Sequence, residues 1–344
     1  MDINTWFKEN MKDWRKPISA SGIMTALSCE RKFLFANKWR LYRKARQYSA
    51  AATFGKILHR LLQVGEAQIE VVHQEIIKQH QELLAQIEKG EDLVGDIARM
   101  ANELHASYTK AVAVVSIFWE RFPPKEYMET VCREERIEGE MQGVPVVGFM
   151  DWVVRDTRNG SVWIRDTKTT SRKAEAMLTG FSHCVQCRFY RLLALNRDWG
   201  KDVKGFILDI VKVPAIKLCG KDEKQAEKDN CSPMEAYIQR VKQWYDDQEE
   251  PAMQSRAIAF NEPVENLEIV RTIDKVKELW EMKPFPRDFS KDLTRGGCYA
   301  YEKVCPYYDL CSSDPVTWPS LIEQMYEVVP EHKDRAEEKK EEEK

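Results

Sequence analysis

The chain has 344 residues, of which 43% are hydrophobic, and a formal net charge of −3 at pH 7. This length allows one large domain or two smaller ones, and no apolar run approaches the length of a membrane-spanning helix. A net charge so close to zero does not indicate nucleic-acid binding, so any contact with DNA would depend on local basic patches. Nine cysteines, an odd number, favour thiols or metal ligands over a complete disulfide framework. The charged N-terminus lacks a signal-peptide core, and we therefore expect a cytoplasmic protein.

The N-terminal region predicts helices and a basic, aromatic segment. Residues 1–16 are expected to be helical and dispensable for chemistry, and Ser19 or Ser21 could cap a helix through IMTALSCERKFLFANKW. Residues 31–46 contain seven Lys or Arg and no acid, interleaved with Phe33, Phe35, Trp39 and Tyr42. Two interpretations stay open: the cations and aromatics bind a single strand of DNA, or the aromatics are simply buried in the core.

A long helical stretch opens with FGKILHRLLQ and continues to about residue 120, with apolar residues at helical spacing. It predicts a helical insertion or arm without catalytic residues, which ends at Pro123 and Pro124. The following segment, VCREERIEGEMQGVPVVGFMD, predicts successive strands with a turn at Gly143. Within it, Glu134 and Glu135 are assigned to strand pairing or salt bridges rather than to a metal.

The chain is organised around residues 146–170, where two β-rich runs flank the sequence DTRNG. The pair Asn159-Gly160 is typical of a hairpin turn. Side chains alternate faces along a strand, so Asp166 and Lys168 share one face and Asp151 lies on a face of the preceding strand. If both faces turn to the same side, two carboxylates and an ammonium meet at the edge of an apolar sheet. Carboxylates about 4 Å apart repel by roughly 4 kcal/mol at an effective dielectric near 20, and a hard divalent cation would relieve this repulsion.

The segment after the hairpin predicts a helix through FSHCVQCRFYRLLALNRDW, with Gln186 and Tyr190 on one face. His183, Cys184 and Cys187 have the residue types of a zinc site, but a continuous helix does not form a closed cage of ligands, and we expect no zinc there. The run GFILDIVKVPAIK predicts a strand, residues 220–230 a surface loop, and MEAYIQRVKQWYDD an amphipathic helix.

Near the C-terminus, Cys298, Cys305 and Cys311 follow a C-x6-C-x5-C spacing in a Gly- and Pro-containing loop. Loops of this kind can bring thiolates together around a metal, and three ligands need a fourth, for which Cys29 is the candidate. Zinc and an iron–sulfur cluster both suit four cysteines. The final run, AEEKKEEEK, predicts a solvated tail.

These motifs, taken together and in order, resemble the PD-(D/E)XK nucleases and most closely their RecB-like exonuclease branch, including phage-type members. The resemblance rests on SCERKFLF with Cys29, Gly55 to His59 (G-x-x-x-H), GFMD with IRDTK, Gln186 to Tyr190 (Q-x-x-x-Y) and the cysteine triplet. Glu30 stands where the branch usually has proline after the first cysteine. One cysteine before the core and three after it is the layout of AddB-type nucleases and of CRISPR-associated RecB-like exonucleases.

The resemblance implies an α/β fold: a restriction-endonuclease-like core, with a central mixed sheet flanked by helices, a helical insertion, and a four-cysteine cluster that clasps the two ends. We expect an N-terminal segment at 1–60, a helical arm at 61–125, the nuclease core at 126–290, a cysteine loop at 291–315 and a charged tail at 316–344. The implied cluster is 4Fe-4S, with zinc as the alternative, held by Cys29, Cys298, Cys305 and Cys311.

The resemblance also implies one or two Mg²⁺ or Mn²⁺ ions on His59, Asp151, Asp166 and the Thr167 carbonyl. Lys168 would steer or deprotonate the attacking water, and Gln186 and Tyr190 would position the strand. The implied function is a DNA exonuclease of recombination, repair or replication, phage-encoded or bacterial. It would act with a separate helicase or recombinase, because the chain has no G-x-x-x-x-G-K-[ST] loop. The alternatives are a catalytically silent iron–sulfur scaffold that binds DNA, and a structure-specific or spacer-processing endonuclease.

Overall fold

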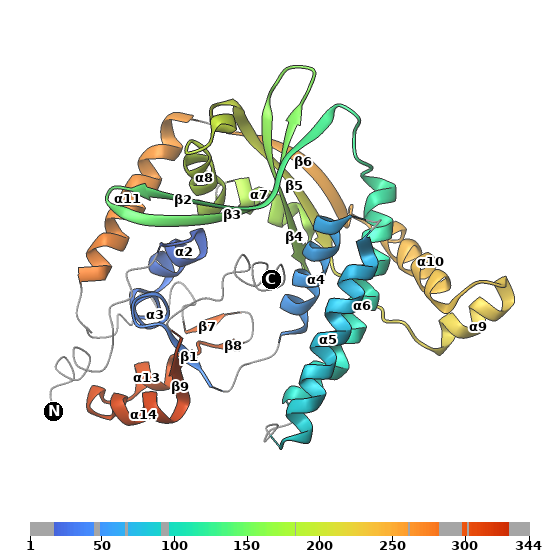
Figure 1. Cartoon of the computed structure of the whole chain (residues 1–344), viewed down its shortest axis with the longest axis horizontal. Helices are drawn as coiled ribbons and strands as arrows, with labels where there is room; N and C mark the ends of the chain where they lie inside the picture. The colour runs from blue at the N-terminus through green and yellow to red at the C-terminus, as the bar shows by residue number, and fades with distance from the viewer. Residues whose placement is uncertain are drawn as a thin grey trace, which may run out of the picture.

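The computed structural model of the chain describes residues 17–44, 49–65, 68–90, 96–182, 184–260, 262–281, 298–300 and 303–329. Its centre is a five-stranded mixed sheet in the order β2-β3-β4-β5-β6 (Figure 1). The strands are β2 (Met128–Met141), β3 (Val144–Asp156), β4 (Val162–Thr170), β5 (Val203–Lys212) and β6 (Met253–Ala259). Only β4 and β5 run parallel; the other pairs are antiparallel. The α/β fold with a mixed sheet is therefore confirmed.

The predicted hairpin joins β3 to β4. Gly160 adopts a φ of +75°, and its N–H donates to the Asp156 carbonyl over 2.8 Å. Glycine is favoured here because a side chain would be strained at positive φ. In the ladder that follows, Val153 pairs with Ile164, and both side chains lie in the same apolar core. The two strands thus present the expected faces to the same side.

Four helices cover one face of the sheet. They are α2 (Ala20–Ser28), α7 (Ala174–Ser182), α8 (Val185–Ala194) and α11 (Glu262–Glu281), and a 3-10 turn, η3 (Asp198–Asp202), follows α8. Ile23 of α2, Phe189 of α8 and Ile273 of α11 are fully buried in one core with sheet residues such as Ile164 and Ile210. Ser19 caps α2, as one of the two predicted caps, by accepting a hydrogen bond from the Gly22 N–H.

A second core lies beside the sheet, where α4 (Ala50–Val64), α5 (Ile69–Glu88), α6 (Asp96–Arg121) and α10 (Pro233–Asp246) pack together (Figure 1). The expected boundary between residues 60 and 61 is corrected, because α4 is continuous across it. The predicted loop at 220–230 is also wrong: α9 (Gly220–Asp229) occupies it, begun by a capping box between Cys219 and Asp222. Its Lys- and Glu-rich sequence has too few apolar residues to show a helical period.

The two ends of the chain pack together in a third unit, which we call the clasp. It comprises α3 (Glu30–Phe33), the π-helical turn η1 (Leu34–Lys38), β1 (Leu41–Arg43), the hairpin of β7 (Tyr299–Ala300) and β8 (Lys303–Val304), α13 (Tyr308–Ser312), the 3-10 turn η4 (Pro315–Thr317), α14 (Trp318–Met325) and β9 (Tyr326–Val328). Strand β1 pairs with β9, and Phe35 packs against Tyr307 and Trp318. Figure 1 shows this unit below the sheet, away from α5 and α6.

The structure of the clasp bears on three expectations. Residues 318–328, within the range expected for the charged tail, belong to it as α14 and β9. The helix expected through IMTALSCERKFLFANKW breaks at Cys29, whose backbone is extended (φ −157°, ψ 113°). Of the two interpretations of the basic, aromatic segment, burial holds for Phe33, Phe35 and Trp39, which are at most 5% exposed, whereas Tyr42 is half-buried.

The predicted helix at 1–16 and the final acidic and basic run lie outside the described residues. Among the helices that are described, none is long and apolar enough to cross a membrane.

Candidate active site

Three carboxylates lie in one row across neighbouring strands. In the β3–β4 register the last pair of the ladder is Trp152 with Arg165. One residue further along the two strands, Asp151 lies opposite Asp166. In the β2–β3 register Arg133 pairs with Trp152 and Glu135 with Met150, which places Glu134 opposite Asp151. The row therefore runs from Glu134 through Asp151 to Asp166.

Asp166 is the buried member of this row, with a side chain only 3% exposed. Lys168 Nζ lies 3.1 Å from its Oδ1 and 2.8 Å from its Oδ2. Gln186 Nε2 donates to Oδ1 over 3.4 Å, from the first turn of α8. Within the described residues Oδ2 accepts no hydrogen bond of good geometry, so this buried oxygen has capacity for a further cationic partner.

His59 reaches the row from α4, and its Nδ1 lies 3.0 Å from Asp151 Oδ2. Helix α4 is positioned by Phe54, Leu58 and Leu61, which are buried in the second core. Gly55 makes this approach possible, because a Cβ there would lie 3.3 Å from the Thr169 hydroxyl of β4. In the G-x-x-x-H motif, the glycine therefore allows α4 to pack closely against β4, and the histidine places its imidazole next to Asp151.

The electrostatics follow from burial and from these pairs. Burial raises the pKa of Asp166 to about 6, although Lys168 opposes the shift. Burial would lower the pKa of Lys168, but Asp166 and Asp151 outweigh it and raise the value above its usual range. Burial also opposes protonation of His59, yet the hydrogen bond and charge of Asp151 raise its pKa overall. At neutral pH Lys168 therefore keeps its proton.

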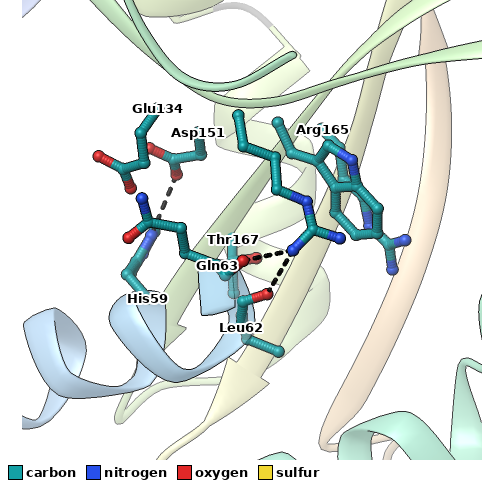
Figure 2. A pocket seen from close by; sticks show the side chains of 9 residues that line it. His59, Leu62, Gln63, Glu134, Asp151, Arg165 and Thr167 are labelled. Atoms are coloured by element: carbon teal, nitrogen blue, oxygen red, sulfur yellow. Dashed lines mark hydrogen bonds and ion pairs between the residues drawn. The ribbon is translucent and has the colours of Figure 1, made fainter. Parts of the chain in front are cut away.

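A pocket opens beside Glu134 and Asp151 of this row, and Figure 2 shows both carboxylates and His59 converging at one end of it. Glu134 has a φ of +48°, a left-handed backbone that is unusual for glutamate and that indicates local backbone strain. We expected Glu134 and Glu135 to serve strand pairing or salt bridges. For Glu135 an ion pair with Arg197, over 2.5 Å, bears this out, whereas Glu134 lines the pocket.

The opposite face of the same strands carries a stacked cationic group. Trp152 lies under the guanidinium of Arg133, at 4.3 Å, and under that of Arg165, at 4.7 Å. Arg165 pairs with Asp209, which is 1% exposed, and Arg133 donates to the carbonyls of Leu62 and Gln63 at the end of α4. These contacts hold α4 against the sheet and line the far side of the pocket.

The remaining predicted residues also lie at this site. Thr167 lines the pocket and is 8% exposed, between Asp166 and Lys168 on β4. Burial, followed by the charges of Asp166 and Asp151, raises the pKa of Tyr190. The structure thus brings together residues of α4, β3, β4 and α8, and Glu134 of β2 joins them as a lining residue of the pocket. A register shift between Thr130 and Cys132 sets the position of Glu134 against β3, and this shift cannot be read from the sequence.

Two cysteine groups were singled out from the sequence. The C-x-x-C pair flanks Gln186, with the sulfurs of Cys184 and Cys187 at 3.7 Å, and His183 lies outside the described residues. In the clasp, Cys29 is the N-cap of α3, Cys305 and Cys311 pack against the apolar core, and the Cys305 N–H donates to the Cys298 carbonyl over 2.8 Å. Arg31, two residues after Cys29, donates to the Cys311 carbonyl over 3.3 Å. The four predicted cluster cysteines therefore lie on elements of the clasp.

Among the described residues, no group of three or more His, Cys, Asp or Glu side chains is arranged closely enough to hold a metal ion as it stands. At the pocket, the ligand-type atoms are engaged in ion pairs, His59 with Asp151 and Lys168 with Asp166. The donor set of carboxylates and an imidazole, with the unsatisfied Asp166 Oδ2, nevertheless fits a divalent cation.

The chain was compared with solved structures, with curated proteins and with protein-family models. A crystal structure of a candidate exonuclease from Eubacterium rectale is similar over 87% of this chain and 94% of that chain, with 13% sequence identity and a TM-score of 0.47. No curated protein matches the sequence. The family model of the PD-(D/E)XK nuclease superfamily matches residues 17–312, which include every residue of the carboxylate row. The chain belongs to the PD-(D/E)XK nuclease superfamily.

Proposed function

We propose that this protein is a metal-dependent DNA exonuclease of the RecB-like type that hydrolyses phosphodiester bonds. The observation that carries the proposal is that two ion pairs lie on neighbouring positions of β3 and β4: Asp166 with Lys168, and Asp151 with His59 from α4. A catalytic site that had decayed into a scaffold would be expected to lack one of these groups.

One or two Mg²⁺ or Mn²⁺ ions would be held by Asp151, Asp166, His59 and the Thr167 carbonyl, with Glu134 as a further oxygen donor. Such an ion lowers the pKa of water and neutralises charge on a phosphate. Carboxylates suit either hard cation, and an imidazole favours Mn²⁺.

Lys168 would donate to a non-bridging phosphate oxygen, because its raised pKa keeps the ammonium charged. This assigns it to transition-state stabilisation rather than to proton abstraction, the other role considered from the sequence. Its Nζ is already fixed by Asp166, so little reorganisation is needed when substrate binds. In the hydrolysis, a water oxygen bonds to phosphorus while the bond to the leaving sugar oxygen breaks and that oxygen gains a proton.

Gln186 and Tyr190 would position the strand and the carboxylates. The Gln186 amide already touches Asp166, and Tyr190 stays protonated because its pKa is raised, so its hydroxyl can donate to a phosphate. Both residues come from α8, which is anchored in the core through Phe189 and Leu193.

The decisive experiment is a time course on end-labelled single-stranded and duplex DNA with Mn²⁺ or Mg²⁺, comparing wild type with Lys168→Ala. Lys173→Ala, at an exposed lysine paired with Glu250, is the matched control. Metal-dependent cleavage that is lost only in Lys168→Ala, with DNA binding retained, supports the proposal. Equal cleavage by Lys168→Ala and wild type would refute the role of Lys168.

Parallel assays separate the alternatives. Linear but not circular DNA should be degraded by an exonuclease, whereas cleavage of circles would favour the structure-specific or spacer-processing endonuclease. If neither wild type nor variant cuts while both bind DNA, the protein acts as a silent scaffold for a helicase or recombination complex. A phage-encoded or bacterial role in recombination, repair or replication rests on the sequence resemblance.

We further propose that Cys29, Cys298, Cys305 and Cys311 hold a 4Fe-4S cluster with a structural role in the clasp. Four thiols drawn from both ends of the chain suit a soft metal site, and zinc is the competing occupant. Iron, sulfide and zinc analysis of anaerobically purified protein, with its visible absorption spectrum, distinguishes the two occupants.

A further inference from the structure

We propose that Cys184 and Cys187 form an oxidation site: a dithiol that undergoes exchange with low-molecular-weight disulfides of the glutathione class. Closure of the internal disulfide would slow cleavage at the neighbouring carboxylate row. The dithiol is separate from the four clasp cysteines and is left unused by the proposed function.

The geometry of the pair suits a reversible disulfide. Cys184 is the N-cap of α8 and Cys187 lies in its first turn, so both thiols are on the same side of the helix start. Their sulfurs are 3.7 Å apart. Because a disulfide bond is about 2.0 Å long, the two side chains must move closer together to form it, and this needs no change of fold. Thiols in a C-x-x-C pair at a helix N-terminus have thiolate character, because the backbone N–H groups stabilise the anion.

The two thiols have different surroundings, and from this difference we infer which of them reacts first with the small disulfide. Cys184 is half-buried, whereas Cys187 is 4% exposed and donates to the Phe181 carbonyl over 3.4 Å. The hydrogen bond between the two thiols lowers the pKa of Cys184 to about 7, and the same contact, followed by burial, raises the pKa of Cys187. Cys184 is thus the attacking thiol, and Cys187 is the resolving thiol.

The incoming small disulfide is the oxidant in this exchange and accepts the two electrons that the dithiol loses. The Cys184 thiolate attacks one sulfur of the small disulfide, whose sulfur–sulfur bond breaks and releases one small thiolate. Cys187 then loses its proton to solvent and attacks the Cys184 sulfur of the mixed disulfide, which releases the second small thiolate. The protein is oxidised by two electrons, and the small disulfide is reduced to two thiols.

The link to catalysis runs through Gln186, which lies between the two cysteines and contacts Asp166. Drawing the sulfurs together moves the start of α8 and with it this amide. Displacement of a positioning group by about 1 Å can cost up to about 100-fold in rate, so we expect a decrease of about 10- to 100-fold. This effect on cleavage rests on the proposed function, whereas the oxidation chemistry does not.

The first arm of the test needs no catalytic activity. Reduced full-length protein is incubated with glutathione disulfide, remaining thiols are alkylated, and peptides are mapped without reduction. A Cys184–Cys187 disulfide that dithiothreitol reverses supports the site. Unmodified thiols, or only a stable glutathione adduct on Cys184, would overturn it.

The second arm compares cleavage of end-labelled DNA before and after oxidation. Wild type should slow on oxidation and recover on reduction, while Cys184→Ser should be insensitive because it lacks the attacking thiol. Cys187→Ser should form no internal disulfide and should keep a glutathione adduct on Cys184 until dithiothreitol is added. Cys231→Ser is the matched control and should slow like wild type. Equal rates for oxidised and reduced wild type would refute the coupling. If reduced wild type does not cleave DNA at all, the proposed function fails and the mapping arm alone decides on the site.

Discussion

Glu134 lies directly opposite Asp151 across β2 and β3, and it holds this position with a backbone φ of +48°. A glutamate in the left-handed region costs about 1 kcal/mol or more relative to glycine. The fold thus accepts a local strain at the position where a third carboxylate meets the pocket. This relationship leads to two predictions about the same residue.

Glu134→Gln should weaken Mn²⁺ binding by about tenfold or more, because an anionic oxygen donor is replaced by a neutral amide at the metal site. Isothermal titration calorimetry measures this directly. The matched control is Glu135→Gln, which removes the ion pair with Arg197 at the adjacent position and should leave Mn²⁺ affinity almost unchanged. Equal affinities of the two variants would contradict a metal-site role for Glu134.

Glu134→Gly should be more stable than Glu134→Ala by about 1 kcal/mol, since both lack the carboxylate and only glycine relieves the positive φ. Urea denaturation of the two metal-free variants gives the difference. A higher stability of Glu134→Ala would show that the backbone at this position relaxes out of the left-handed region.

Mn²⁺ affinity should rise with pH between about 5 and 7. Burial raises the pKa of Asp166 to about 6, and Asp151 raises that of His59 above its ordinary value of about 6.5, so both groups bind protons in the metal-free protein at the acidic end. A metal ion must displace these protons, and binding is therefore weaker where they are bound. Titrations at several pH values should show the rise levelling off once both groups are deprotonated.

His59→Gln separates the two contributions. The variant should bind Mn²⁺ more weakly at pH 8, and the part of its pH dependence that lies above the Asp166 pKa should be lost. An affinity independent of pH between 5 and 7 in wild type would mean that neither group is a ligand.

Asp222→Asn should reduce stability at neutral pH by about 1–2 kcal/mol, because Asp222 accepts two hydrogen bonds from Arg240 and one from the Cys219 N–H. The hydrogen bond with Arg240 lowers the pKa of Asp222 below its usual range. A lowered carboxyl pKa contributes stability above the unfolded-state value of about 4, and this contribution is lost as the pH falls through the folded-state value. Melting temperatures of wild type and variant should therefore converge in acid; a constant gap down to pH 2 would disprove the assignment.

Cys305→Ala should destabilise the clasp and abolish bound metal, because Cys305 joins the β7–β8 hairpin to the core that contains Phe35 and Tyr307. Cys219→Ala, at an exposed cysteine outside the clasp, is the control. Metal analysis, visible absorption and thermal unfolding are the measurements. A soluble, colourless and fully active Cys305→Ala protein would refute the cluster.

Much of the site could be predicted because its residues are tied to local patterns. Asp166 and Lys168 lie two apart on one strand, Gln186 and Tyr190 lie four apart on one helix, and the turn at Gly160 fixes the hairpin between the two halves. These spacings of two residues on a strand and four on a helix can be recognised directly in the sequence. They predicted the faces of β3 and β4 and the approach of α8.

The residues that escaped prediction depend on long-range packing. The position of Glu134 follows from a register shift in β2, and the burial of Phe35 follows from contacts with Tyr307 and Trp318, more than 270 residues later in the chain. The same holds for residues 318–328, which we assigned to the charged tail because a Lys- and Glu-rich run follows them. Trp318 is 1% exposed inside the clasp, where it packs against Phe35 from the other end of the described chain.

The pairing of β1 with β9 has a consequence for biosynthesis. Arg43 pairs with Tyr326, which is 283 positions later in the chain. At synthesis rates of about 5–20 residues per second, the ribosome needs about 15–60 s to supply this partner. During that interval Leu34, Phe35 and Leu41 lack the surface that buries them, and they are exposed to chaperones or to the same segment of another nascent chain. Closure of the clasp is thus a step that follows translation, and we expect it to control when the nuclease is complete.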